Sequence, residues 1–191
     1  MWYHTTIIDT LRPFRIRPGS KQWVDATRQT PTAICEASLN QLKSLAVTYR
    51  YNQPSSLYSI LHHTSLLYIG NAVLGPRNQA DWRFFWDLCV STYIELYTCY
   101  RICAGFLQGL LELAINNHYI HLDEGRAVLG RLIAKGKTFN APVKFKSAHL
   151  IDFELALSHP GSGSAQIEQC SERVVSLALR DDPDPLMPAV S

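Results

Sequence analysis

Charged side chains are scarce in this sequence: Asp, Glu, Lys and Arg make up 18% of its 191 residues. The net charge is only +2, so no strong overall field would draw the chain to nucleic acid or to an anionic membrane. Apolar residues make up 47%, which is enough for one domain with its own hydrophobic core and excludes a wholly disordered chain.

Cysteines are few, and no apolar run is long enough to cross a membrane. The most apolar stretch, residues 84–115, is interrupted by four charged side chains, whereas a membrane span needs roughly 18 uninterrupted residues. The amino end lacks the order of segments found in a signal peptide. The cysteines are odd in number and scattered, unlike a secreted disulfide framework: Cys35, Cys89, Cys99, Cys103 and Cys170. These absences favour a soluble intracellular protein.

Motifs for catalysis are also missing. The sequence has no Gly-x-Ser-x-Gly turn, no phosphate-binding glycine loop and no dinucleotide-binding turn. Cys99 and Cys103 are the only close cysteine pair, without a second pair to complete a zinc site, so we expect both to be buried thiols. Adjacent His62 and His63 would point about 100° apart on a helix and would not share a cavity.

His118 and His121, near Asp123, fit a solvated helix cap better than a metal site. We therefore predict no catalytic, cofactor-binding or metal-ligating residue, no cofactor and no enzymatic activity. A helical hydrolase that uses His62 or His118 is a minor alternative.

Apolar residues recur at three- and four-residue steps, which predicts helices. From 85 to 114 the pattern fits either one long helix or two helices broken near Gly105, and Gly136 is placed to follow the last turn of a basic helix. The fold class expected is all-α, an irregular bundle of about six or seven helices with a short extended segment near the C-terminus. The helices expected before residue 140 cover 2–11, 31–50, 57–74, 85–114 and 123–135.

Beyond Pro142 the pattern changes. Residues 147–157 fit a short strand or an extended docked segment, and residues 165–179 fit a last helix. We therefore divide the chain into a helical core (1–140), which the family resemblance described below makes a regulatory one, a C-terminal docking segment with the last helix (141–180), and an acidic, disordered tail (181–191). The tail mixes acidic and apolar residues, a composition that suits coactivator contacts as well as plain disorder.

Basic residues gather after residue 122. Only two aromatic residues, Phe139 and Phe145, lie among them, which favours a solvated helix face over a nucleic-acid surface. The cluster comprises Arg126, Arg131, Lys135, Lys137, Lys144 and Lys146. By contrast, residues 51–122 carry three basic and four acidic side chains, which is typical of a core-forming block.

Several short motifs together resemble one family. The first is Tyr3-His4 followed by Leu11-Arg12-Pro13-Phe14, and a late one is Asp152-Phe153-Glu154-Leu155-Ala156-Leu157. Between and after them come residues 37–50, 89–90, 106–114, 124–132 and 166–179. In this order they resemble the C-terminal part of the regulatory domain of fungal zinc binuclear cluster (zinc two-cysteine-six) transcription factors.

The resemblance implies a nuclear, helical module that controls transcription through helix-mediated dimerisation or a response to an effector, and that does not catalyse a reaction. The family binds DNA through a six-cysteine, two-zinc cluster, and this sequence has no such cluster, so we expect no direct nucleic-acid binding. The resemblance would also make the core truncated at its N-terminus. Apolar residues of the first helix, such as Tyr3, Ile7, Ile8 and Leu11, would then lack partners and favour self-association.

The partners expected are therefore a second copy of the chain or another protein, with no membrane and no identified small-molecule effector. The alternative function is a helical protein-interaction or scaffold protein without catalytic activity.

Overall fold

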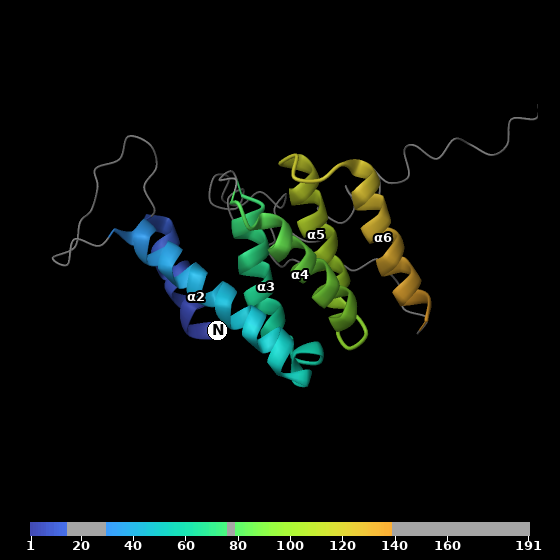
Figure 1. The fold of residues 1–191 in the computed structure, drawn as a ribbon, viewed down its shortest axis with the longest axis horizontal. Coiled ribbons are helices and arrows are strands. Elements are labelled where there is room, and N and C mark those ends of the chain that lie inside the picture. Colours follow the sequence, from blue (N-terminus) through green and yellow to red (C-terminus); the bar gives the residue numbers. More distant parts are fainter. Residues whose placement is uncertain (15–29, 76–78, 139–191) are drawn as a thin grey trace, which may run out of the picture.

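The structure, a computed structural model, describes residues 1–14, 30–75 and 79–138, which form six α-helices and contain no strand (Figure 1). The predicted all-α fold is confirmed. The predicted extended segment (147–157), last helix (165–179) and acidic tail (181–191) lie outside the described residues.

The helices begin and end where local chemistry favours it. Thr30 caps α2, because its Oγ1 accepts a hydrogen bond from the Ala33 amide at 3.2 Å, and Pro31 occupies the first turn. Asp123 and Glu124 lie in the first turn of α6, where the helix dipole favours negative charge. The elements are α1 (Trp2–Leu11), the 3₁₀ turn η1 (Arg12–Phe14), α2 (Pro31–Asn52), the 3₁₀ turn η2 (Pro54–Leu57), α3 (Ile60–Val73), α4 (Trp82–Leu96), α5 (Ile102–Asn116) and α6 (Leu122–Lys137).

The break between α4 and α5 lies at residues 97–101, and the prediction of a break near Gly105 was wrong. Gly105 is buried inside α5. No glycine or proline marks the true break, which tertiary contacts fix instead: Tyr97 is fully buried, and the Tyr100 hydroxyl donates to the Tyr58 carbonyl at 2.8 Å. A local sequence pattern does not contain such contacts.

Other boundaries shift by a few residues. Helix α3 begins at Ile60 and not at Leu57, because Pro54–Leu57 forms η2. Helix α6 continues through Gly136 to Lys137, so Gly136 is not its terminal glycine. On α6, Ala127 is exposed, whereas Val128 beside it is buried.

The six helices form a stacked array in which contacts are local in sequence. Each helix packs on the next one in the chain, α1, α3 and α5 form a row of contacting helices, and α4 also contacts α6. Figure 1 shows α2, α3, α4 and α6 in succession across the molecule. This connectivity is that of stacked helical hairpins, in which each unit buries its apolar face against its neighbours.

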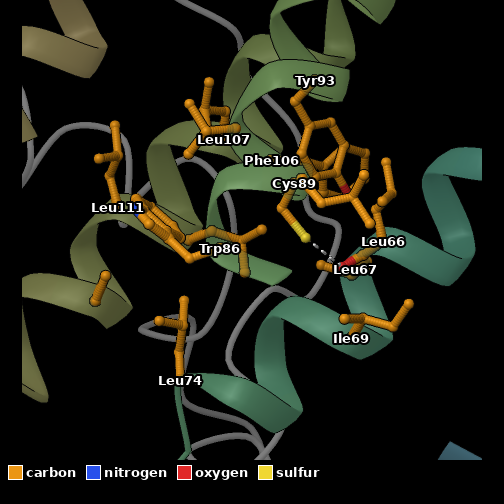
Figure 2. Packing of buried hydrophobic residues seen from close by; sticks show 14 of the residues in the cluster. Leu66, Leu67, Ile69, Leu74, Trp86, Cys89, Tyr93, Phe106, Leu107 and Leu111 are labelled. Atoms are coloured by element: carbon orange, nitrogen blue, oxygen red, sulfur yellow. Dashed lines mark hydrogen bonds between the residues drawn. The ribbon is translucent and has the colours of Figure 1, made fainter. Parts of the chain in front are cut away.

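A large part of the core lies between α3, α4 and α5 (Figure 2). Trp86 and Tyr93 of α4 and Phe106 of α5 are almost completely buried there. Each such side chain contributes on the order of 1.5–3 kcal/mol through burial. Gly70 allows α3 to approach α5 closely, because a Cβ atom at Gly70 would lie 2.9 Å from Leu110 Cδ1.

Candidate functional site

His62 is a buried histidine where α2, η2 and α3 meet. Its Nδ1 lies 3.3 Å from the Ser56 carbonyl oxygen, and its ring packs edge-on against Tyr49 with centroids 5.2 Å apart. Within the described part of the chain, Nε2 has no hydrogen-bond partner. Burial lowers the pKa of His62, and the nearby Arg50 charge lowers it further. The geometry holds a neutral imidazole and offers no access for a substrate.

His63 lies in a different environment, as predicted for adjacent helical residues. Its ring centroid is 4.2 Å from that of Phe106, and the Tyr93 hydroxyl donates to the His63 carbonyl oxygen at 3.1 Å. Full burial raises the pKa of the Tyr93 hydroxyl well above its usual value. The two histidines therefore serve separate packing contacts and do not share a cavity.

The cysteines divide into buried and exposed thiols. Cys89 and Cys103 are fully buried in the core, and burial raises the pKa of each to about 12. The prediction that Cys99 is also a core thiol was wrong, because Cys99 is exposed in the connection between α4 and α5. Its four-residue spacing from Cys103 does not span a helical turn, since the chain is not helical at that point.

The other candidate ligands do not converge. His118 and His121 are exposed, and His118 has a positive φ of 60° in the connection between α5 and α6. His121 precedes α6, but its side chain makes no capping hydrogen bond. In residues 1–14, 30–75 and 79–138, no group of three or more His, Cys, Asp or Glu side chains could hold a metal ion.

Ion pairs hold α6 against α4 at both ends. Arg83 lies 2.7 Å from Glu124 near the start of α6, and Lys135 lies 3.2 Å from Glu95 near its end. Two members of the predicted basic cluster therefore have their charge paired with a carboxylate: Lys135 with Glu95, and Arg126 with Asp123. Of the cluster, Arg131 and Lys137 are exposed, while Lys144, Lys146, Phe139 and Phe145 lie outside the described residues.

Exposed apolar side chains lie at the starts of α1 and α3. The Ser65 hydroxyl donates to Met1 Sδ at 3.4 Å, so the start of α1 lies against the first half of α3. Next to Met1, Trp2 is 62% exposed and Tyr3 is 73% exposed. Leu61, one turn before Ser65, is also exposed. We call the exposed side chains at these two helix starts the apolar edge: Trp2, Tyr3, Tyr58, Ile60 and Leu61.

The rest of α1 departs from the prediction that its apolar residues lack partners. Ile8 is buried in the core, while Ile7 and Leu11 are half-buried. The expected unpartnered surface of α1 is therefore confined to its first turn.

Two buried polar side chains on α5 were not predicted. Gln108 is 1% exposed, and neither of its amide atoms has a hydrogen-bond partner in the described structure. Glu112, one turn later, is also buried and accepts a weak hydrogen bond from Asn116 at 3.5 Å. The available signal was a pair of polar residues four apart within an otherwise apolar helix.

No family model matches this chain, and no curated protein or solved structure matches it either. Among the described helices, none is both long and apolar enough to traverse a lipid bilayer. The arrangement of these side chains and the family resemblance of the sequence are therefore what point to a function.

Proposed function

We propose that this chain is a regulatory, non-DNA-binding module of a fungal transcription factor, located in the nucleus, that self-associates through helix surfaces. The support comes first from the resemblance, whose segments fall on regular elements of the array. Residues 3–14 cover α1 and η1, residues 37–50 lie in α2, residues 106–114 lie in α5, and residues 124–132 lie in α6.

The observation that carries the proposal is the apolar edge. Its aromatic side chains are mostly exposed at the starts of two contacting helices, and exposed aromatic residues are typical of protein–protein contacts, in which they supply a large buried area at low entropic cost. Of the two histidines considered for a hydrolase, His62 is buried in packing contacts and His118 is exposed without a neighbouring group of metal ligands in the described residues. A second copy of the chain, meeting the first at the apolar edge, would cover Trp2, Tyr3 and Leu61.

Sedimentation of the full-length chain tests this self-association. We expect a dimer at micromolar concentration for the unaltered chain and a monomer for the double variant Trp2→Ser, Leu61→Ser. Phe84→Ser is the matched control, because Phe84 is a half-exposed aromatic residue on α4, outside the apolar edge. A monomeric unaltered chain, or dissociation caused equally by Phe84→Ser, would contradict the proposal.

A role in transcription separates the proposal from the alternative, a helical scaffold protein. The full chain would be fused to a monomeric DNA-binding domain whose operator requires two copies. With the unaltered chain we expect the fusion protein to localise to the nucleus and to occupy the operator of the reporter. With the Trp2→Ser, Leu61→Ser variant we expect the operator to be unoccupied. A dimer that stays in the cytoplasm would favour the scaffold alternative.

A further inference from the structure

Helix α5 is buried around its whole circumference. Every one of the twelve consecutive residues from Cys103 to Ala114 is buried. An amphipathic helix at the end of a row would keep a polar, solvent-facing side. The described helices that pack on α5 are α3, α4 and α6.

The contacts of α5 show which side each of these neighbours covers. Leu110 faces α3, where it meets Gly70, and Ile115 faces α6, where it meets Gly125. Leu111 belongs to the same buried cluster as Trp86 of α4, and Figure 2 shows both side chains in the core between these helices. Successive residues lie about 100° apart around a helix. The directions of Leu110, Ile115 and Leu111 therefore leave one sector of α5 that faces none of the three neighbouring helices.

That sector is formed by Gly105, Gly109 and Glu112, which we call the glycine face. All three residues are buried although they point away from Leu110 and Leu111. Gly105 and Gly109 are one turn apart, so a second helix could approach this face closely. Gln108 borders the glycine face, and its buried amide has no partner in the described part of the chain, although such an amide normally has one.

We propose that the glycine face of α5 is the docking surface for this chain's own residues 165–179. The segment follows α6, which itself packs on α5, and the 53 residues after Thr138 are ample to reach the glycine face. Residues 15–29 are a poorer occupant, because they join α1 to α2 at the other end of the array.

The sequence of residues 165–179 suits this surface. On a helix, Ile167, Cys170 and Val174 would form one apolar stripe to pack against the two glycines. Arg173, next to that stripe, carries the charge complementary to Glu112, and the segment's polar side chains include partners for the Gln108 amide.

Amide hydrogen exchange of the full-length chain tests the docking from both sides. We expect residues 165–179 to exchange slowly in the unaltered chain. Val174→Asp should speed exchange roughly tenfold or more in both 165–179 and α5, without changing α2. Gly109→Leu, which fills the glycine face, should speed exchange in residues 165–179.

Two matched controls keep the result specific. Ser176→Asp introduces the same charge on the opposite side of the segment, and Gly130→Leu enlarges a glycine of α6 that has open space around it. Both should leave exchange in α5 and in residues 165–179 unchanged. The proposal is overturned if residues 165–179 exchange at the rate of an unstructured peptide, or if Val174→Asp leaves α5 unchanged.

A second copy of the chain is the competing occupant of the glycine face. If protection of α5 rises with protein concentration in step with dimer formation, the proposal is also overturned. The docking does not depend on the apolar edge, so the Trp2→Ser, Leu61→Ser variant should retain the slow exchange of residues 165–179.

Discussion

Lys43 of α2 and Asp81, the residue before α4, form an ion pair in which Nζ lies 2.9 Å from Oδ2 and 3.1 Å from Oδ1. The Lys43 side chain is almost fully buried, whereas that of Asp81 is half-exposed. The ammonium group also donates to Gln79 Oε1 and lies 4.6 Å from the centroid of the Phe85 ring. This cluster ties α2 to the start of α4.

Removing the two partners of this ion pair should have unequal effects on stability. Asp81→Ala leaves a buried ammonium group without its counter-charge and should lower the free energy of unfolding by about 1–3 kcal/mol, less than for a fully buried pair because Asp81 is half in water. Lys43→Met removes the buried charge and keeps much of the volume, so its cost should be under about 1 kcal/mol. Urea unfolding measures both, and a larger loss for Lys43→Met would contradict this account.

Acid should destabilise the fold through His62. Burial lowers the pKa of His62 in the folded state, so below pH 6.5 the unfolded chain takes up a proton that the folded chain does not. The contribution of His62 to stability is therefore complete above pH 6.5 and falls as the pH decreases toward the folded pKa. The slope should approach about 1.4 kcal/mol per pH unit at most.

Urea unfolding between pH 7.5 and 5 measures this dependence. His62→Leu should remove most of the slope in this range, even if it changes the stability at neutral pH. His121→Gln is the matched control, because His121 is exposed, and it should leave the slope unchanged. Equal slopes in the unaltered chain and in His62→Leu would refute the role of His62.

Thiol reactivity should separate the four described cysteines. Burial keeps Cys89 and Cys103 protonated and inaccessible at neutral pH, and Cys35 is buried as well. Cys99 is exposed and should be labelled by a neutral disulfide reagent at least about 100-fold faster than the other three in the native chain. Peptide mapping after brief labelling identifies the modified residue, and comparable labelling of Cys103 would contradict the packing.

Helices could be predicted from sequence because their apolar spacing is local information. The pattern over 31–50 gave α2, whose observed bounds differ by only two residues. The spacing of apolar residues does not decide burial at Lys43 and Leu45 within α2: the apolar Leu45 is 39% exposed, whereas the charged Lys43 is buried. Lys43 is buried because it binds Asp81 and Gln79, which lie 38 and 36 residues away in the sequence. The spacing of apolar residues within α2 contains no information about such distant partners.

The candidate surfaces were less predictable for the same reason. The sequence correctly separated His62 from His63, since adjacent positions on any helix diverge. It could not place Cys99 outside the core, because the break at residues 97–101 depends on the buried Tyr97 and on the contact of Tyr100 with Tyr58. It also gave no reason for the burial of Gln108, which depends on what surrounds α5.

Glycine-to-alanine substitutions should change stability in opposite directions at two helical positions. Gly130 lies on the exposed side of α6 with nothing within 4 Å of an added Cβ, so Gly130→Ala should stabilise the fold by about 0.5–1 kcal/mol through helix propensity alone. At Gly70 the same gain competes with a contact of 2.9 Å to Leu110 Cδ1, and Leu110 is fully buried with little room to move. Overpacking costs typically about 1–3 kcal/mol, so Gly70→Ala should be destabilising on balance.

Combining Gly70→Ala with Leu110→Ala should recover the propensity gain relative to Leu110→Ala alone, because the clash is then absent. Thermal and urea unfolding of the four variants measure these differences, and a destabilising Gly70→Ala in the Leu110→Ala background would show that the close approach of α3 and α5 is not what limits residue 70.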